Sequence, residues 1–141
     1  NTLLCNIHKV LKENGLLVCE FGANRNIATI ENAFAQVCGE LGYEYNPKFN
    51  FPTSENFADL LQKNGFIIDK VYDYDRPTPL KDNENGLSNW MKQFFASELE
   101  LIPEKTQVEI FKKVEGLTKD TLWNGSEWVA DYRRLRAIAH I

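Results

Sequence analysis

The amino-acid sequence predicts an α/β fold, and two neighbouring stretches indicate it. Apolar residues three and four apart over residues 3–11 predict an amphipathic helix, and Gly15 is typical of the turn after a helix end. The apolar run over residues 16–21 is short and stops at Gly22, as expected for a strand. A strand that is apolar on both faces is typical of a sheet covered by helices on two sides. We therefore expect helices layered on a sheet.

Composition limits the classes of protein to consider. The 141 residues are 43% hydrophobic, which is enough for a single domain over residues 1–141 with a substantial core. A formal net charge of -4 offers no basic surface for nucleic acid or an anionic membrane. The sequence contains neither a bilayer-spanning apolar run nor the pattern of a signal peptide, and we expect a cytoplasmic protein. The cysteines lack the spacing of a metal or redox site, so we interpret Cys5, Cys19 and Cys38 as buried free thiols.

A second helix and a loop follow the first strand. Apolar residues with helical spacing predict a helix over residues 27–41, and Asn26 is of a type that caps helices. Gly42 is expected to end this helix. Residues 43–51 are rich in aromatic side chains without a clear period, which predicts a loop.

A third helix and a second strand come next. Thr53 or Ser54 is placed to cap the helix, which Asn64 and Gly65 close. Residues 66–75 then predict a strand that follows at once. Its second half alternates between apolar and polar side chains, which is typical of a strand nearer the edge of a sheet.

The last part of the chain predicts two more helices and a returning strand. The two prolines in residues 76–80 exclude regular structure there and indicate an extended connector. Residues 86–95 have helical spacing, and Pro103 is expected in the first turn of another helix. The strongest turn signal is Asn124-Gly125, and residues 135–141 alternate enough for a final strand.

Common catalytic motifs are absent from the sequence, so the catalytic residues stay unknown. It contains no phosphate-binding loop with its lysine, no nucleophile elbow, no HExxH zinc motif and no GxGxxG dinucleotide motif. No metal site is expected. Polar residues at the strand ends are instead expected to gather at one rim of the sheet. They are Glu20, Asn24, Arg25, Asp73, Asp75, Arg76, Asp131, Tyr132, Arg133 and Arg134.

Several segments resemble one enzyme family. Residues 10–18, VLKENGLLV, are similar to the passage before the fifth sheet strand of class I S-adenosylmethionine-dependent methyltransferases. Four later segments resemble the trans-aconitate methyltransferase-like branch of that family. These segments are residues 51–55, 60–66, 75–80 and 131–136.

The resemblance implies a partial Rossmann-like methyltransferase sheet. Its three strands would be the fifth, the sixth and an antiparallel seventh, with covering helices. The physical pattern agrees, because two strands joined through helices are followed by one that returns after a turn. The family uses S-adenosylmethionine as its cofactor and binds a small-molecule methyl acceptor at the rim.

The cofactor-binding segments of the family would lie upstream of Asn1, so the resemblance assigns no cofactor role to any residue of this chain. We expect the carboxyl-terminal, acceptor-side half of a longer methyltransferase, inactive as a fragment. The alternative is a non-enzymatic interaction module that reuses half of the fold. Because the edge of residues 16–21 would lack a neighbouring strand, we expect it to be covered by a second copy, giving a homodimer, or by a displaced helix.

Six residues are the predicted acceptor contacts. Arginine side chains offer a fork that matches an acceptor carboxylate, but they could equally pair with acidic residues of the chain itself. An aromatic residue at the rim could contact the acceptor or belong to the core. The six residues are Glu20, Asn24, Arg76, Trp90, Tyr132 and Arg133.

Overall fold

A computed structural model describes residues 2–141 of the chain, which form two compact units. The sheet unit comprises the described residues up to Asn26 together with Asn50–Arg76 and Arg133–Ile141. The helical unit comprises Ile27–Phe49 and Pro77–Tyr132. That the two units form a single domain stays a prediction.

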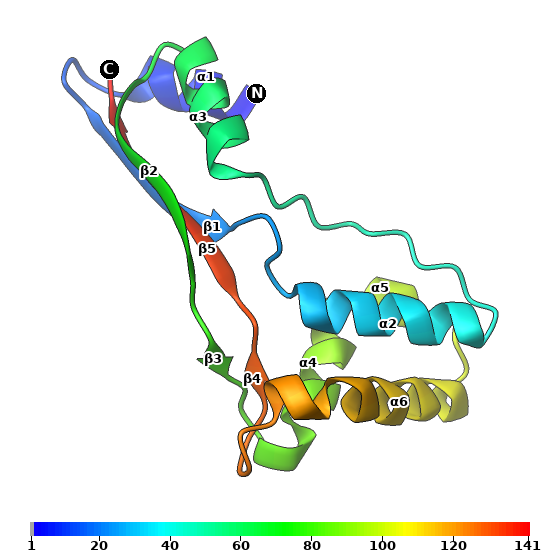
Figure 1. The fold of residues 1–141 in the computed structure, drawn as a ribbon. Helices are drawn as coiled ribbons and strands as arrows, with labels where there is room; N and C mark the ends of the chain where they lie inside the picture. Colours follow the sequence, from blue (N-terminus) through cyan, green and yellow to red (C-terminus); the bar gives the residue numbers. More distant parts are fainter. Residues whose placement is uncertain (1) are drawn as a thin grey trace. The chain divides into compact units, whose positions relative to one another are not determined.

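The sheet unit contains a three-stranded sheet made of β1 (Leu16–Gly22), β2 (Ile67–Asp75) and β5 (Arg133–His140). The last strand, β5, lies between the other two and is antiparallel to both, which makes β1 and β2 parallel to each other (Figure 1). The predicted returning strand is therefore confirmed, and it begins two residues earlier than the alternating pattern indicated.

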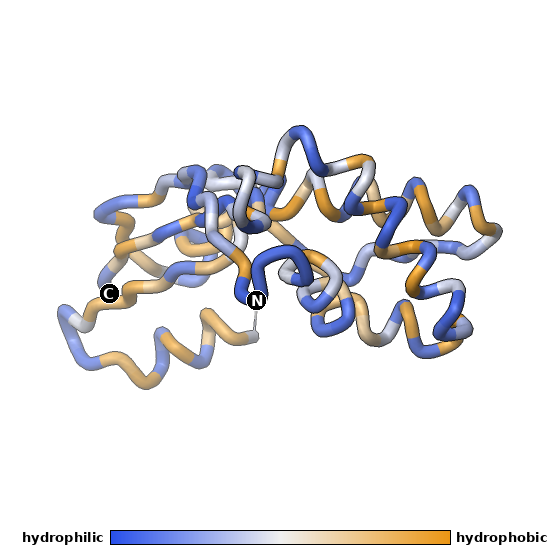
Figure 2. Tube along the Cα trace, turned by 90° about the horizontal axis from the view of Figure 1, so that it is seen from below, coloured by the Kyte–Doolittle hydropathy of each residue, from blue (hydrophilic) through white to orange (hydrophobic). Residues whose placement is uncertain are grey.

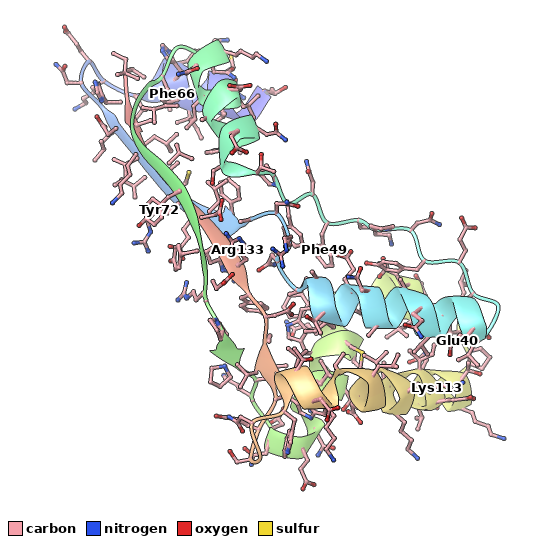
Figure 3. All side chains as sticks on the ribbon, viewed as in Figure 1. Glu40, Phe49, Phe66, Tyr72, Lys113 and Arg133 are labelled. Carbon is pink, nitrogen blue, oxygen red and sulfur yellow. The ribbon has the colours of Figure 1, made fainter. Side chains whose placement is uncertain are left out.

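Helices α1 (Thr2–Val10) and α3 (Ser54–Lys63) pack on one face of this sheet. Leu135, Ala137 and Ala139 of β5 face them, and because these residues are apolar and two of them are small, the helices can approach closely. Phe66, which precedes β2, packs in the same core, with its ring centroid 5.4 Å from that of His8 (Figure 3). The core of the sheet unit is formed by Leu4, Ala23, Phe57, Leu61, Phe66, Leu135, Ala137 and Ala139.

The opposite face of the sheet carries exposed apolar side chains. Leu16 and Val18 of β1 are 56% and 59% exposed, and Ile67 of β2 is 59% exposed. The expectation that the first strand is buried on both faces is therefore wrong for residues 2–141. The reason is that the helices of the sheet unit cover only the other face, where Leu17, Cys19 and Phe21 pack.

The two helix caps predicted from sequence have different outcomes. Thr53 caps α3 as predicted, because its hydroxyl oxygen accepts a hydrogen bond from the Asn56 N–H at 3.1 Å. The predicted cap at Asn26 is wrong. The second helix, α2 (Ala28–Glu40), starts after Ile27, which adopts a left-handed φ of 56°. Asn26 instead accepts a hydrogen bond from the Arg133 N–H at 2.8 Å.

The helical unit is built around α2 and the long α6 (Glu104–Leu122). Helix α4 (Gly86–Phe94) also packs against α6, and Phe34 of α2 stacks on Phe95 with a centroid distance of 4.2 Å. Hydrophobic and hydrophilic residues alternate along the helical turns, as expected for helices with one buried side (Figure 2). Two short helices complete this set, η1 (Asn83–Asn85) and α5 (Ala96–Leu99).

A short two-stranded ladder corrects the prediction for the proline-rich segment. Strand β3 (Thr78–Pro79) pairs antiparallel with β4 (Val129–Ala130). The segment is extended, as predicted, but it is not a mere connector. Proline is tolerated because, among the described residues, β3 has a partner strand on one side only. The next N–H, that of Leu80, donates to the Trp128 carbonyl at 2.8 Å.

Two further observations concern residues 2–141 as a whole. None of the described helices combines the length and the apolar character that crossing a membrane requires. The three cysteines are free thiols, as predicted, but only Cys38 is buried, whereas Cys5 and Cys19 are partly exposed.

Candidate functional site

Glu20, near the end of β1, is the centre of a cluster of hydrogen bonds and ion pairs on the sheet. The Tyr74 hydroxyl donates to Glu20 Oε2 at 2.7 Å, and Arg76 Nη1 donates to Oε1 at 2.7 Å. Arg136 Nε donates to Oε2 at 2.8 Å. The structure thus brings Glu20 and Arg76 together, and the arginine pairs with an acidic residue of the chain itself.

These bonds also set the ionisation of the cluster. The Tyr74 hydroxyl makes the largest contribution in holding the pKa of Glu20 below its ordinary value, and Arg136 adds a hydrogen bond and a positive charge. The same hydrogen bond raises the pKa of Tyr74. A carboxylate with a lowered pKa is a poor general base at neutral pH. Glu20 therefore serves better as an anchor for the two arginines than as a base.

Arg133, at the start of β5, forms a second cluster. Its guanidinium pairs with the carboxylates of Asp73 and Asp75, and its Nη1 lies 2.5 Å from Asp75 Oδ1. The Ser54 hydroxyl, at the start of α3, donates to Asp73 Oδ2 at 2.6 Å. Hydrogen bonds from Ser54 first and Arg133 second hold the pKa of Asp73 below its ordinary value.

The two clusters lie on opposite faces of the sheet. In an antiparallel ladder, paired residues share a face, and Glu20 pairs with Arg136 while Asp75 pairs with Arg133. Arg133 and Arg136 are an odd number of residues apart on the same strand, so their side chains point to opposite faces. The polar residues expected as a single group at the rim are therefore divided between two faces.

Two asparagines follow β1 and differ in how far their side chains are buried. Asn24, a predicted contact, is exposed, and its backbone N–H donates to the Pro52 carbonyl at 2.9 Å. Asn26 is only 5% exposed and holds the start of β5 through the Arg133 N–H. The local sequence pattern predicts a helix cap at Asn26. It does not indicate the observed role, because the hydrogen-bond partner of Asn26 is 107 residues away in the sequence.

Trp90 and Tyr132, the remaining two predicted residues, meet in the helical unit. Trp90 Nε1 donates to the Tyr132 hydroxyl oxygen at 2.7 Å, and the centroid of the Trp90 ring lies 4.7 Å from that of Phe94. Phe95 is fully buried, whereas Phe94 is 43% exposed. Phe95, which follows α4, thus belongs to the core, whereas Trp90 and Phe94 of α4 line a cavity of about 400 Å³. Its lining includes Thr78, Asn89, Trp90, Gln93, Phe94 and Tyr132.

In the part of the chain that the structure describes, no group of three or more histidine, cysteine or carboxylate side chains could hold a metal ion. The side chains described above offer hydrogen bonds, ion pairs and aromatic rings for recognition.

Comparison with known proteins identifies a similar fold. No protein-family model matches the chain, and no curated protein matches it in sequence. A provisionally named methyltransferase from Bacillus halodurans matches in structure with a TM-score of 0.50 and 11% identity, over 99% of this chain and 61% of that one. Phosphoethanolamine N-methyltransferase 2 from Haemonchus contortus, in complex with phosphomonomethylethanolamine and S-adenosylhomocysteine, gives a TM-score of 0.38 and 14% identity, over 99% of this chain and 29% of that one.

The chain thus spans 61% of the length of the first of these proteins and 29% of the second. The first similarity shows that the described chain has a methyltransferase-like fold.

Proposed function

We propose that the chain is the acceptor-side part of a cytoplasmic S-adenosylmethionine-dependent methyltransferase that acts on a small molecule. The observation behind the proposal is the sheet, in which β5 lies antiparallel between two strands that are parallel to each other. The resembled family has this arrangement at its fifth, seventh and sixth strands. In this proposal β1 is the fifth strand, β2 is the sixth and β5 is the seventh. The chain would belong to the trans-aconitate methyltransferase-like branch of the family.

The described residues do not fit the cofactor itself. A cofactor-binding turn needs a glycine whose backbone is open to the ligand, but a Cβ added at Gly22 would lie 2.5 Å from the Phe51 ring. Glu20, the acidic residue near the end of the same strand, already has both carboxylate oxygens bonded to other side chains. We therefore propose that S-adenosylmethionine is bound by polypeptide outside this chain.

In this proposal the described chain positions the methyl acceptor. The cavity beside Trp90 and Tyr132 is within the size range of small-molecule sites. Holding an acceptor in one orientation can supply a large part of the rate of a transfer between two bound molecules. Glu20, Asn24, Arg76 and Arg133 stay predicted acceptor contacts. An acceptor carboxylate would reach Arg133 only by exchanging an existing ion pair.

The exposed face of the sheet supports a role for further polypeptide. Leu16, Val18 and Ile67 expose more than half of their surface, although burying each would contribute about 1.5 to 3 kcal/mol. We propose that the cofactor-binding half covers this face in the complete enzyme.

The experiment is to read the coding sequence upstream of Asn1 and to purify its complete product. We expect S-adenosylhomocysteine to raise the melting temperature of the complete product and to leave residues 1–141 alone unchanged, because a ligand stabilises only the protein that binds it. A start codon at Asn1, or a complete product that does not respond, would contradict the proposal.

A second candidate function is an interaction module without catalysis. The edge of β1 favours it, because within residues 2–141 β1 pairs with β5 alone and its other row of backbone groups has no neighbouring strand. A partner strand could complete the sheet there. Reading the coding sequence upstream of Asn1 also distinguishes the two candidate functions. An in-frame segment that predicts a strand followed by a glycine-rich turn would favour the enzyme, and a start codon at Asn1 would favour the interaction module.

A further inference from the structure

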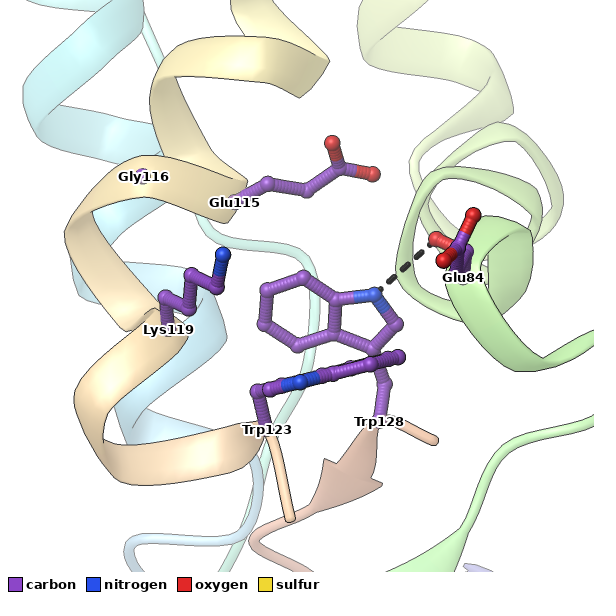
Figure 4. Close-up of a pocket in the computed structure, with 6 residues that line it drawn as sticks. All are labelled: Glu84, Glu115, Gly116, Lys119, Trp123 and Trp128. Atoms are coloured by element: carbon purple, nitrogen blue, oxygen red, sulfur yellow. Dashed lines mark hydrogen bonds between the residues drawn. The ribbon is translucent and has the colours of Figure 1, made fainter. Parts of the chain in front are cut away.

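A second cavity, in the helical unit, has the chemistry of a cation-binding site. It has a volume of about 480 Å³ and lies beside α6, the turn after it and η1 (Figure 4). None of its lining residues is among those of the Trp90 and Tyr132 cavity. The lining consists of Glu84, Glu115, Gly116, Lys119, Trp123 and Trp128.

Two indole rings form adjoining walls of this cavity. The ring centroids of Trp123 and Trp128 are 5.3 Å apart, and the ring planes are inclined by 61°. Trp128 is only 5% exposed, and its Nε1 donates to the Glu84 carbonyl at 3.0 Å (Figure 4). The two rings contact each other edge to face, so their planes meet at an angle and form two neighbouring aromatic walls of the cavity. Neighbouring aromatic walls also occur in sites that bind a small cation.

The turn between the tryptophans holds the rings in place. The two residues pair as an isolated antiparallel bridge, and Asn124 Oδ1 accepts hydrogen bonds from the Ser126 and Glu127 N–H groups, both at 2.9 Å. The Trp123 N–H also donates to the Lys119 carbonyl at 3.0 Å, which ties the turn to the end of α6. A site that is largely formed in advance loses less entropy when it binds a ligand.

The charges of the cavity favour a cation over an anion. Glu84 and Glu115 contribute two carboxylates, against the single ammonium of Lys119. Glu115 extends from α6 over the cavity, and within residues 2–141 no side chain forms a hydrogen bond or an ion pair with its carboxylate (Figure 4). Burial raises the pKa of the Glu115 carboxyl group. The positive charge of Lys112 lowers this pKa, but by less than burial raises it. A bound cation would supply the ion pair at contact distance that this carboxylate does not form within residues 2–141.

We infer that this cavity binds a small organic cation, an alkylated ammonium group enclosed by Trp123, Trp128 and Glu115. The indole faces attract the positive charge and its methyl groups, while the carboxylate supplies the opposite charge. The inference does not depend on the proposed methyltransferase function, because it concerns a different cavity.

The test is a titration with choline, followed by nitrogen–proton NMR of the indole N–H groups. The chain contains three tryptophans, so Trp90 is an internal control for the other two. We expect saturable shifts for Trp123 and Trp128 and none for Trp90, at constant ionic strength. The neutral isostere of choline, in which carbon replaces the nitrogen, should bind at least about tenfold more weakly.

Three variants complete the test. Glu115→Gln and Trp123→Phe are expected to weaken choline binding by about tenfold and about threefold, because they remove the opposite charge and the better aromatic face. Glu109→Gln, on the same helix but outside this cavity, should leave the affinity within about twofold of that of the unaltered chain. The inference is overturned if choline causes no saturable shift, if the neutral isostere binds equally well, or if Glu115→Gln binds choline as the unaltered chain does.

Discussion

Asp131 shows how one side chain caps a helix that is distant in the sequence. Its Oδ2 accepts a hydrogen bond from the Thr29 N–H, in the first turn of α2, at 2.8 Å. Its carbonyl oxygen accepts a hydrogen bond from the Ile27 N–H at 3.1 Å. We predict that Asp131→Ala lowers the free energy of unfolding by about 1 to 2 kcal/mol, the cost of losing a helix cap. Urea unfolding followed by circular dichroism measures this change.

Two further variants serve as references for that prediction. Asp131→Asn keeps an oxygen acceptor in the same place and should lose less stability than Asp131→Ala. Thr53→Ala removes the local cap of α3 and should cost about 1 kcal/mol. An Asp131→Ala variant as stable as the unaltered chain would show that the long-range cap contributes nothing.

Asp73 should make the stability of the sheet unit depend on pH. Its pKa is lowered mainly by the Ser54 hydroxyl and then by Arg133, so the folded chain favours the ionised carboxylate. This contribution is present above the ordinary pKa, near about 4, and is lost as the pH falls through the lowered value. We predict that Asp73→Asn costs about 1 kcal/mol at neutral pH and almost nothing at about pH 2.

The matched control for this prediction is Asp75→Asn. Asp75 pairs with the same arginine, but its side chain is 77% exposed, and such pairs contribute little. Unfolding curves at both pH values should show a loss for Asp73→Asn that shrinks in acid and a small effect for Asp75→Asn. An equal loss for Asp73→Asn at both pH values would contradict the ionic explanation.

At the scale of elements, two glycines should respond in opposite directions to the same substitution. Gly65, between α3 and β2, has a φ of +86°, and an added Cβ would lie 2.9 Å from His8 Nε2. We predict that Gly65→Ala lowers the free energy of unfolding by about 1 to 2 kcal/mol. For Gly116, inside α6, an added Cβ would meet no described atom within 4 Å apart from its chain neighbours and the backbone of its own helix, so Gly116→Ala should raise that free energy by about 0.5 to 1 kcal/mol. Thermal and urea unfolding measure both effects, and equal signs would contradict the conformational explanation.

The elements with a clear period were predictable, and the shortest ones were not. Helix α3 and strand β2 begin and end within one or two residues of the prediction, because a cap and a turn glycine mark them locally. Strands β3 and β4 have two residues each, too few to show any period. The register shift between Ile68 and Lys70 in β2 also lacks a local signal, since it depends on the pairing with β5.

At the scale of the whole molecule, the open edge of β1 predicts self-association of the isolated chain. Leu16 and Val18 are exposed beside an edge that has no neighbouring strand within residues 2–141, and such edges pair with other chains. We predict that the mass measured by light scattering after size-exclusion chromatography rises with concentration towards that of a dimer. Val18→Lys should shift the equilibrium towards the monomer by at least about tenfold.

Leu101→Lys is the control for that prediction. Leu101 is 90% exposed but lies in the helical unit, so its replacement should leave the association unchanged. A chain that stays monomeric at every concentration, or a Leu101→Lys variant that dissociates as strongly as Val18→Lys, would exclude association through β1.

The sequence by itself determined the α/β class, the long helices and strands, and the cap at Thr53. Periodicity and capping are local, because they reflect which side of a single element is apolar and which backbone groups at its end need a partner. Among the residues predicted for the candidate site, Glu20 meets Arg76 and Trp90 meets Tyr132. That these residues contact a methyl acceptor stays a prediction.

Only the tertiary structure decided how those residues are grouped. The pairing register of β5 places Glu20 and Arg133 on opposite faces of the sheet, and a shift of one residue would have reversed this. Asn26 and Asp131 form their bonds with backbone groups more than 100 residues away. Register and long-range hydrogen bonds depend on the partner segment, and the local sequence pattern of either segment does not contain that information.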